Sequence, residues 1–348
     1  MSEIVRNAAN EVIGKGLQLY NRVPYTMRRD SNQIVVFNTS VSTDNLGDFI
    51  IMHYCNQALH EMFGERKYID ISTHQIPSAA DEKIVIETKY KFVCGTNLLT
   101  SHIEQWWNWR LPDGLRGKLP YRNVILMGVG WGTYQDECSN YSKLIYRSLL
   151  NPSVLHSVRD QYTEEKLKAA GIKNVINTGC PTMWKLTPDY CAEIPYEKAR
   201  KVVTTVTDYR QDITQDNLML QILSRNYETV YLWLQGKYDG EYLKLLDIPA
   251  NVVIIPRNLQ AYVNYLVPGE IDYVGTRLHA GIFALNHKVR SIIIAVDNRA
   301  IEIAKDTNLT ILRRENILFE LEQKILSPKA SAIRINTKNI QRFKAQFL

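Results

Sequence analysis

The chain has 348 residues, of which 45% are hydrophobic and 22% are charged, and its formal net charge is +6. This size and composition favour a soluble globular protein with two compact domains, and no apolar run approaches the roughly 20 residues of a membrane-spanning helix. The moderate positive charge suits an anionic substrate or an acidic membrane surface, and it gives little support to a nucleic-acid-binding function. Residues 1–30 contain no apolar signal-peptide core, which predicts a cytoplasmic protein.

The cysteines argue against a metal or disulfide framework. There are five, they are scattered, and none forms a Cys-x-x-Cys pair: Cys55, Cys94, Cys138, Cys180 and Cys191. Structural zinc sites and disulfide-rich domains need closely spaced or paired cysteines. We therefore expect buried free thiols and no metal site.

In the first half of the chain, apolar runs typical of buried strands alternate with helical patterns. The predicted strands span residues 34–37, 67–71, 90–94, 123–130, 154–158 and 175–177, and the predicted helices span residues 47–62 and 163–170. A cluster of prolines, polar residues and acids then marks a break at residues 188–195.

The same alternation restarts after this break. The predicted strands span residues 202–206, 229–234, 252–255, 291–296 and 309–312. Helical patterns are found at residues 216–225, after the segment that contains Arg277 and His279, and from residue 313 to the end. Such alternation predicts an α/β protein with parallel sheets and helices on both faces. We expect two Rossmann-like domains, residues 1–190 and 191–348, with ligands beyond the carboxyl ends of the strands.

The most informative motif is the segment Thr276-Arg277-Leu278-His279, which directly precedes an apolar helical pattern. It places Arg277 and His279 near a helix N-terminus, where free backbone N–H groups and the helix dipole favour an anion. A permanent cation beside a group that titrates near neutrality suits a phosphorylated acid. Arg299 follows the next strand and is a second candidate cation; the alternative is a solvated loop arginine.

Polar loops of the first half are further candidates for binding a substrate. Asn45 and Gly47 follow the first strand and are followed by Asp48; the alternative is a helix cap. Arg159 lies at a strand end beside Asp160, and the alternative there is an ion pair at a helix start.

Two more segments of the first half have both a functional and a structural interpretation. Gly95 and Asn97 follow another strand, and the alternative is an ordinary turn. Three indoles, Trp106, Trp107 and Trp109, occur within four positions. Indoles stack on sugar rings and lie at membrane surfaces, so this cluster predicts an acceptor or membrane contact; the alternative is a small core under a loop.

Taken in chain order, these motifs resemble the polysaccharide pyruvyl transferase family. The resemblance rests on Asp44-Asn45-Leu46-Gly47-Asp48, Ser157-Val158-Arg159-Asp160, Thr178-Gly179-Cys180-Pro181 and Arg277-Leu278-His279-Ala280. It implies a fold similar to the two-domain glycosyltransferase B architecture. It also implies phosphoenolpyruvate as donor, a sugar with two nearby hydroxyls as acceptor, and a cyclic pyruvate ketal as product, with no further cofactor.

The resemblance also implies roles for individual residues. Arg277, with the adjoining Leu278, and His279 match the donor-site motif of the family, and Arg159 matches a further anion ligand. Where members carry Gly-x-Pro, this chain has Lys288-Val289-Arg290, and where members often carry lysine it has Arg299. Arginine keeps the charge but not the titration of lysine, which argues against proton transfer at this position.

The chemistry of the donor then assigns the remaining roles. Protonation of C3 makes C2 of phosphoenolpyruvate electrophilic, so the site needs an acid, cations and a base for the sugar hydroxyl. We expect His279 as the acid or a phosphate ligand, Asp48 as the base, and Arg277, Arg299 and Arg159 as the cations.

Other functions and partners stay open at this point. A nucleotide-sugar glycosyltransferase of the same fold is the main alternative, with Glu302 on the ribose. A non-enzymatic protein is the other, and the retained Arg277 and His279 argue against it. A lipid-linked acceptor, peripheral contact with the inner face of the membrane, and a homo-oligomer are all compatible with the sequence.

Overall fold

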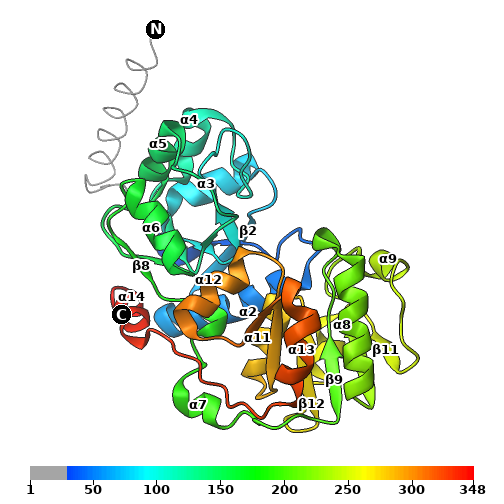
Figure 1. Cartoon of the computed structure of the whole chain (residues 1–348). Coiled ribbons are helices and arrows are strands. Elements are labelled where there is room, and N and C mark those ends of the chain that lie inside the picture. Colours follow the sequence, from blue (N-terminus) through cyan, green and yellow to red (C-terminus); the bar gives the residue numbers. More distant parts are fainter. Residues whose placement is uncertain (1–29) are drawn as a thin grey trace. The chain divides into compact units, whose positions relative to one another are not determined.

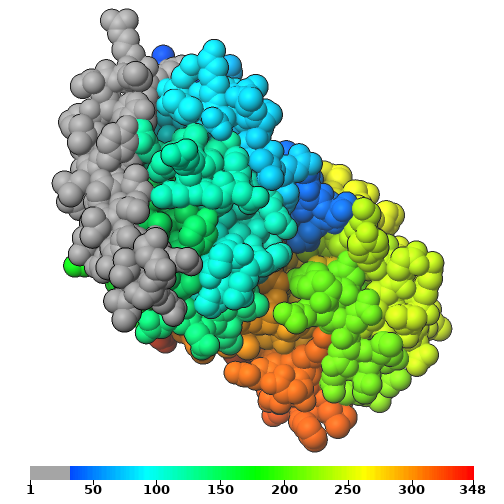
Figure 2. Space-filling view, turned by 90° about the horizontal axis from the view of Figure 1, so that it is seen from above, coloured from blue at the N-terminus to red at the C-terminus, as the bar shows by residue number. Residues whose placement is uncertain are grey.

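The computed structural model describes residues 30–348, and the predictions made for residues 1–29 lie outside this range. Its contacts divide the chain into two units. Within the described residues, unit 1 comprises 30–43, 51–181 and 336–348, and unit 2 comprises 44–50 and 182–335. The predicted division at residue 190 differs from this grouping in three segments, 44–50, 182–190 and 336–348. Residues 182–335 run from green to orange in the ribbon of Figure 1 and in the space-filling view of Figure 2.

Unit 1 contains a parallel sheet with the strand order β2-β1-β3-β5. These strands are β1 (Asp30–Asn38), β2 (Lys67–Ser72), β3 (Thr88–Cys94) and β5 (Ile125–Met127). Two further parallel pairs are formed by β4 (Asn97–Leu99) with β6 (Gly130–Trp131) and by β7 (His156–Val158) with β8 (Val175–Asn177). Strand β7 lies next to β5 and extends the layer of strands.

The helices of this part of the chain include both of those predicted. They are α2 (Leu46–Phe63), α3 (Ala79–Glu87), α4 (Gly114–Lys118), η1 (Leu119–Tyr121), α5 (Asn140–Leu149), α6 (Gln161–Ala169) and α14 (Thr337–Ala345). Residues 46–50 of α2 are grouped with unit 2. The unpredicted helix α3 begins at a capping box, in which the Ser78 hydroxyl accepts from Asp81 N–H and the Asp81 carboxylate accepts from Ser78 N–H.

The single strand predicted for residues 123–130 is wrong, because the structure breaks it after Met127. Gly128 has φ +66°, a left-handed conformation that interrupts the strand. The ring of Pro181 packs directly over Gly128, so a Cβ there would clash with it. The backbone N–H of Gly128 donates to the hydroxyl of Ser157 at 3.0 Å. The chain therefore turns here and resumes as β6 at Gly130.

Aromatic side chains hold the C-terminal segment in unit 1. The ring of Phe347 lies 5.4 Å from that of Phe63 and 5.3 Å from that of Phe92, measured between centroids. Phe343 is fully buried beside it. Each such aromatic pair contributes about 0.5–1.5 kcal/mol beyond area burial, so residues 336–348 belong to unit 1 despite their position in the sequence.

His156 of strand β7 is buried as a neutral side chain. Its Nδ1 accepts from the Leu126 N–H at 3.2 Å, and its Nε2 donates to the Asn151 carbonyl at 2.9 Å. The amide can only donate and the carbonyl can only accept, so these contacts select the tautomer with a proton on Nε2. Burial lowers the pKa of His156 to about 4, although the bond to Asn151 opposes this shift.

Unit 2 contains a six-stranded parallel sheet with the order β11-β10-β9-β12-β13-β14. The strands are β9 (Lys201–Thr204), β10 (Thr229–Trp233), β11 (Val252–Ile255), β12 (Ile271–Gly275), β13 (Ser291–Ala295) and β14 (Ile311–Arg313). The chain moves outward from β9 to β11, crosses to the other side of β9 at β12, and moves outward again. The strand order therefore reverses between β9 and β12, and ligands of doubly wound sheets bind at such a point.

Helices connect these strands, and α8 packs against α13 (Figure 1). The helical elements are η2 (Pro181–Met183), α7 (Pro188–Ala192), η3 (Asp208–Arg210), α8 (Ile213–Asn226), α9 (Asp239–Leu243), α10 (Leu259–Val263), α11 (Leu278–Asn286), α12 (Asn298–Thr307), η4 (Arg314–Asn316) and α13 (Ile317–Leu326). The predicted α/β class with parallel sheets is thereby confirmed.

Strand β12 was not predicted, because a charged residue interrupts its apolar pattern. Asp272 is 2% exposed and pairs with Arg290 at 2.8 Å, and it accepts from the Tyr227 hydroxyl at 2.7 Å. Burial raises the pKa of Asp272 even though Arg290 opposes the shift. The same Arg290 also donates to the carbonyls of Lys324, Ile325 and Ser327 at the end of α13.

Two simpler predictions concern the whole described range. All five cysteines are buried free thiols, as the sequence predicts. Within residues 30–348, every helix is too short or too polar to cross a membrane.

Candidate functional site

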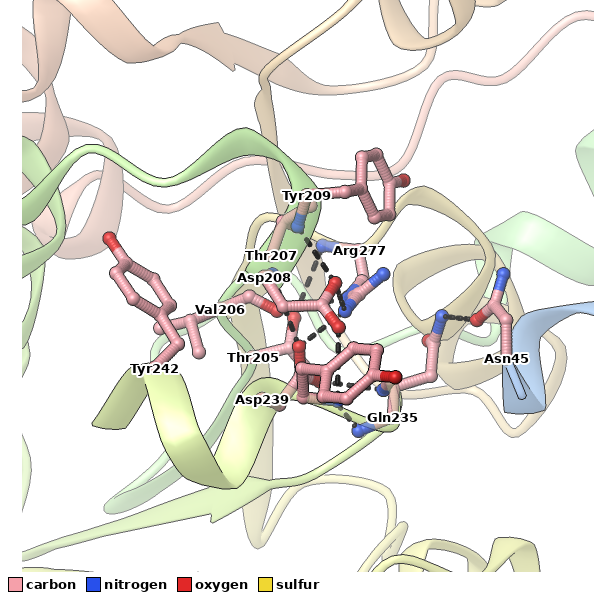
Figure 3. Close-up of polar contacts among 12 residues, drawn as sticks. Asn45, Thr205, Val206, Thr207, Asp208, Tyr209, Gln235, Asp239, Tyr242 and Arg277 are labelled. Atoms are coloured by element: carbon pink, nitrogen blue, oxygen red, sulfur yellow. Dashed lines mark hydrogen bonds and ion pairs between the residues drawn. The ribbon is translucent and has the colours of Figure 1, made fainter. Parts of the chain in front are cut away.

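The candidate site of unit 2 lies where the loops after β9, β10, β12 and β13 meet at the carboxyl edge of the sheet. Figure 3 shows its polar contacts, which centre on Arg277 after β12, Asp208 after β9 and Asp239 after β10. Arg299 follows β13. This is the edge at which the strand order reverses, so the predicted Arg277 motif lies at the switch point of the sheet.

Arg277 is the N-cap residue of α11 and is almost completely buried. Its Nε donates to the Val206 carbonyl at 2.9 Å, and its Nη2 donates to Asp208 at 2.9 Å and to Asp239 (Figure 3). Within residues 30–348, Nε and Nη2 make all the hydrogen bonds found for this guanidinium. Nη1 is thus the edge of Arg277 that is left for a ligand.

The charge of Arg277 is more than balanced by two neighbouring carboxylates. Burial works against its charged form, but Asp239, Tyr209 and Asp208 together outweigh burial and raise its pKa. One guanidinium and two carboxylates leave this cluster with a net negative charge. Anion binding at this edge therefore depends on Arg299 and on the N-terminus of α11 as well as on Arg277.

Asp239 holds the loops of the site together. Its Oδ2 accepts from the backbone N–H groups of Gln235 at 2.9 Å and Gly236 at 2.7 Å, and its Oδ1 accepts from Asp208 N–H at 3.2 Å and from Arg277. The carboxylate is fully buried, and all four partners are donors. A Cβ on Gly236 would clash with the Arg277 guanidinium, so this position requires glycine.

Tyr209 brings the two predicted cations of unit 2 together. The Arg299 Nη2 donates to the Tyr209 hydroxyl at 2.5 Å, and the Tyr209 ring centroid lies 5.0 Å from Cζ of Arg277. Arg299 also pairs with Asp297, at 2.5 Å. Burial opposes the charged form of Arg299, but Tyr209 and Asp297 outweigh it and raise its pKa. Arg299 is therefore an ordered cation and not a solvated loop arginine.

Leu278 and His279 occupy the first turn of α11, directly after Arg277. Both are buried, with His279 6% exposed. The predicted placement of the motif at a helix N-terminus is confirmed by these bounds. The roles of these two residues toward a donor stay predictions.

The loop that carries Asn45 and Gly47 belongs to unit 2, although the sequence places it in the first half. Asn45 Oδ1 accepts from Gln235 Nε2 at 2.8 Å (Figure 3) and from Gly47 N–H at 3.0 Å, and Leu46 N–H donates to the Gln235 carbonyl at 3.2 Å. A Cβ on Gly47 would lie 2.8 Å from Gln235 Nε2. Asp48 follows in the first turn of α2 and is buried. The contacts thus link Asn45 to Asp239 through Gln235.

In unit 1, the structure brings together Arg159, Asn97 and Asp160. Arg159 is 2% exposed, and its Nη1 donates to Asn97 Oδ1 at 2.7 Å while its Nε donates to Asp160 at 3.1 Å. The side chain of Asp160 also caps α6 by accepting from Thr163 N–H. The structure thus contains the ion pair at a helix start, and the role of Arg159 toward an anion stays a prediction. Nearby, Gly95 has φ +61°, and a Cβ there would clash with Ile51.

The three indoles near residue 107 have different surroundings. Trp107 and Trp109 are buried with their rings 5.2 Å apart, and Trp107 Nε1 donates to the Leu98 carbonyl at 2.7 Å. Trp106 is 55% exposed. Trp107 and Trp109 are thus part of the core, and Trp106 is the indole of this cluster that presents a face to solvent.

Sequence reasoning missed the residues that organise the Arg277 cluster. These are Asp208, Tyr209, Gln235 and Asp239. A signal was present, because all four follow the predicted strands 202–206 and 229–234 at their carboxyl ends, where ligand sites of parallel sheets lie. Within residues 30–348, no group of three or more His, Cys, Asp or Glu side chains is placed to hold a metal ion.

Comparison with known proteins adds a family and a fold. The family described as "Polysaccharide pyruvyl transferase" matches residues 45–298. Sequence comparison with curated proteins finds no significant match. A UDP-GlcNAc 2-epimerase of Methanocaldococcus jannaschii, solved with UDP-GlcNAc and UDP, is 12% identical with a TM-score of 0.52, covering 90% of this chain and 98% of the epimerase. This likeness bears on the fold alone and agrees with the predicted glycosyltransferase B type of architecture.

Two other solved structures are similar over most of the chain. MnaA of S. aureus, solved with UDP, is 12% identical over 86% of this chain and 91% of its own, with a TM-score of 0.47. The wall teichoic acid polymerase TagF is 13% identical over 99% of this chain and 90% of its own, with a TM-score of 0.42.

Proposed function

Because the chain belongs to the polysaccharide pyruvyl transferase family, we propose that it transfers the enolpyruvyl group of phosphoenolpyruvate to a sugar. Two neighbouring hydroxyls of the sugar become bridged as a cyclic pyruvate ketal, and inorganic phosphate is released. The proposal places this step in the biosynthesis of a surface or extracellular polysaccharide. It requires neither a metal nor a cofactor.

The observation that carries the proposal is the position of Arg277 and His279. Both lie at the N-terminus of α11, within the matched residues 45–298 and at the edge where the strand order of unit 2 reverses. The helix N-terminus, the Nη1 edge of Arg277 and the neighbouring Arg299 all favour a donor that carries phosphate and carboxylate groups.

The proposed reaction assigns a role to each group. His279 protonates C3 of phosphoenolpyruvate, and the resulting cation at C2 is attacked by one sugar hydroxyl, whose proton passes to Asp48. The bond between C2 and the phosphate oxygen then breaks, and phosphate leaves with the electron pair. The second hydroxyl attacks the new cation at C2 and closes the ketal, and its proton passes to the released phosphate. Arg277 and Arg299 offset the negative charge of the donor.

Several residues complete the proposed substrate contacts. Arg159 and Asn97 form the buried polar cluster of unit 1, and Gly95 lets the backbone turn beside it. Asn45 and Gly47 form the loop that contacts Gln235. The backbone N–H of Leu278 belongs to the first turn of α11, whose free donors suit an anion.

The reaction class can be tested directly by mass spectrometry. Candidate sugars, both free and lipid-linked, are incubated with the protein and phosphoenolpyruvate. A product that gains pyruvate minus water, together with release of inorganic phosphate, supports the proposal. Sugars that stay unmodified while phosphoenolpyruvate fails to bind contradict it.

Two variants separate donor binding from turnover. Arg299→Gln should weaken phosphoenolpyruvate binding by about 1.5–3 kcal/mol, the range for hydrogen bonds to charged groups. His279→Gln should mainly lower turnover, by about 10²–10⁴-fold for a general acid. Arg277→Ala is a poorer choice, because it leaves the buried carboxylates of Asp208 and Asp239 without the cation that they pair with. If both variants keep the wild-type donor affinity and turnover, the donor site must lie elsewhere in the protein.

A nucleotide-sugar glycosyltransferase is the alternative function. Its ribose ligand would be an acidic residue such as Glu302, which is 6% exposed in α12 and pairs with Lys305 at 2.5 Å. Calorimetric titration with phosphoenolpyruvate and with uridine diphosphate distinguishes the two functions. Tight binding of the nucleotide with no heat from phosphoenolpyruvate favours the alternative.

The proposal also includes a location and partners. We expect the reaction in the cytoplasm, with peripheral contact at the inner face of the membrane where the acceptor is lipid-linked. Co-sedimentation with vesicles that contain anionic lipid tests the membrane contact, and a homo-oligomer is tested by light scattering.

A further inference from the structure

Unit 1 contains a cavity that is lined by none of the residues assigned to the proposed reaction. It measures about 360 Å³ and lies between the loop around residues 103–113, helix α4 and Tyr141 of α5. The exposed indole of Trp106 forms part of its wall. This volume falls in the range of about 300–1,000 Å³ for small-molecule sites in proteins.

Two buried hydrogen-bond donors line this cavity. Lys118 is 4% exposed, and its Nζ donates to the Pro112 carbonyl at 2.7 Å, which satisfies one of three N–H groups. Burial lowers the pKa of Lys118, although Asp113 opposes the shift. The indole Nε1 of Trp109 is buried with no hydrogen-bond partner among residues 30–348. Buried donors normally have acceptors, so the two remaining N–H groups of Lys118 point to a ligand that accepts from them.

The charges around the cavity balance. Glu104 and Asp113 are acidic, and Arg110 and Lys118 are basic. A wall with two charges of each sign has no net attraction for a phosphate or for a cation. It offers both donors and acceptors, which match a neutral ligand rich in hydroxyl groups.

We propose that this cavity binds one pyranose ring of the acceptor glycan, with the apolar face of the ring stacked on Trp106. The ring hydroxyls accept hydrogen bonds from Lys118 and donate to Glu104 or Asp113. An indole suits the apolar face of a sugar, since it combines a large flat surface with few rotatable bonds. The assignment rests on the proposed function only in identifying the sugar as the acceptor.

The test uses saturation-transfer NMR on the full-length protein with a panel of methyl pyranosides. At least one pyranoside should receive saturation from the wild-type protein. Trp106→Ala should lower its affinity about tenfold, which corresponds to about 1.4 kcal/mol, and Trp106→Phe should keep most of the binding. The matched control is Tyr134→Ala, because Tyr134 is another aromatic residue of unit 1 and is 53% exposed. This variant should bind as the wild type does.

The outcomes separate this inference from the proposed function. No binding of any pyranoside, or equal binding by the wild type and Trp106→Ala, overturns the cavity assignment. Phosphoenolpyruvate titration of the same samples reports on the donor site independently. If phosphoenolpyruvate binds while Trp106→Ala has no effect, the transferase proposal stands and the sugar site does not. If pyranosides bind through Trp106 but phosphoenolpyruvate does not bind, the sugar site stands and the donor assignment fails.

Discussion

Replacing Asp239 by asparagine should disrupt the Arg277 cluster with almost no change in shape. The carboxylate of Asp239 accepts four hydrogen bonds, two on each oxygen, and all four partners are donors. In either orientation of an asparagine amide, its NH₂ group faces two N–H donors. The side chain is fully buried, so water cannot compensate.

The magnitude follows from these contacts. At least two hydrogen bonds to a charged group are lost, each contributing about 1.5–3 kcal/mol. Breaking a buried ion pair by removing one partner costs about 3–5 kcal/mol. We therefore expect Asp239→Asn to lower the free energy of unfolding by about 3–5 kcal/mol. With about 2–4 °C per kcal/mol for a domain of this size, the melting temperature of unit 2 should fall by roughly 6–20 °C.

Urea unfolding and hydrogen-exchange mass spectrometry measure this effect. Exchange should accelerate at residues 205–210 and 235–239, whose backbone groups bind to Asp239 or Arg277. The matched control is Asp44→Asn, because Asp44 makes an exposed ion pair with Lys237 at 3.1 Å, and such pairs contribute about 0–1 kcal/mol. An Asp239→Asn protein that unfolds within about 1 kcal/mol of the wild type, with unchanged exchange in these loops, would refute the role of Asp239.

Three further substitutions or conditions test the fold around the two sites. Burial lowers the pKa of His156 to about 4, below the usual 6.5, so the unfolded chain takes up the proton first and stability is lost as the pH falls between these values. Urea unfolding should show about 2 kcal/mol less stability at pH 5 than at pH 7, and a His156→Gln variant with the same loss would contradict this. Gly128→Ala should cost about 1–3 kcal/mol, since its Cβ would meet a proline ring. Gly64→Ala is its control, because Gly64 has a similar φ of +63° and open space around it, and equal melting temperatures for the two variants would exclude the clash. Arg290→Met should cost about 3–5 kcal/mol by leaving Asp272 buried without its cation, and calorimetry showing a loss below about 1 kcal/mol would argue that the pair is dispensable.

The sequence alone was sufficient to predict the class of fold and the location of the main motif. Strands that are buried on both faces occur in a sequence as continuous apolar runs. The alternation of such runs with helical patterns therefore indicates parallel sheets before any contact is known. Arg277 and His279 could likewise be placed at a helix start, because an apolar helical pattern begins directly after them. These inferences depend on neighbours in the sequence.

Local pattern failed where long-range contacts override it. Strand β12 was missed because Asp272 breaks its apolar run, and this charge is tolerated only because Arg290 and Tyr227 reach it from other elements. The strand predicted for residues 123–130 is interrupted at Gly128 by a proline that is distant in the sequence. Neither the partners of Asp272 nor the proline over Gly128 can be identified from a window of neighbouring residues.

The partners of the candidate site were decided by the tertiary structure. Asp208 and Asp239 bind Arg277 although they are 69 and 38 residues away in the sequence. The loop with Asn45 joins unit 2 through Gln235, which is 190 residues away. Whether Arg277 faces an open anion site or two carboxylates depends on which loops the strand order brings to the same edge of the sheet. That order arises from the packing of whole elements, and local sequence preferences carry no information on it.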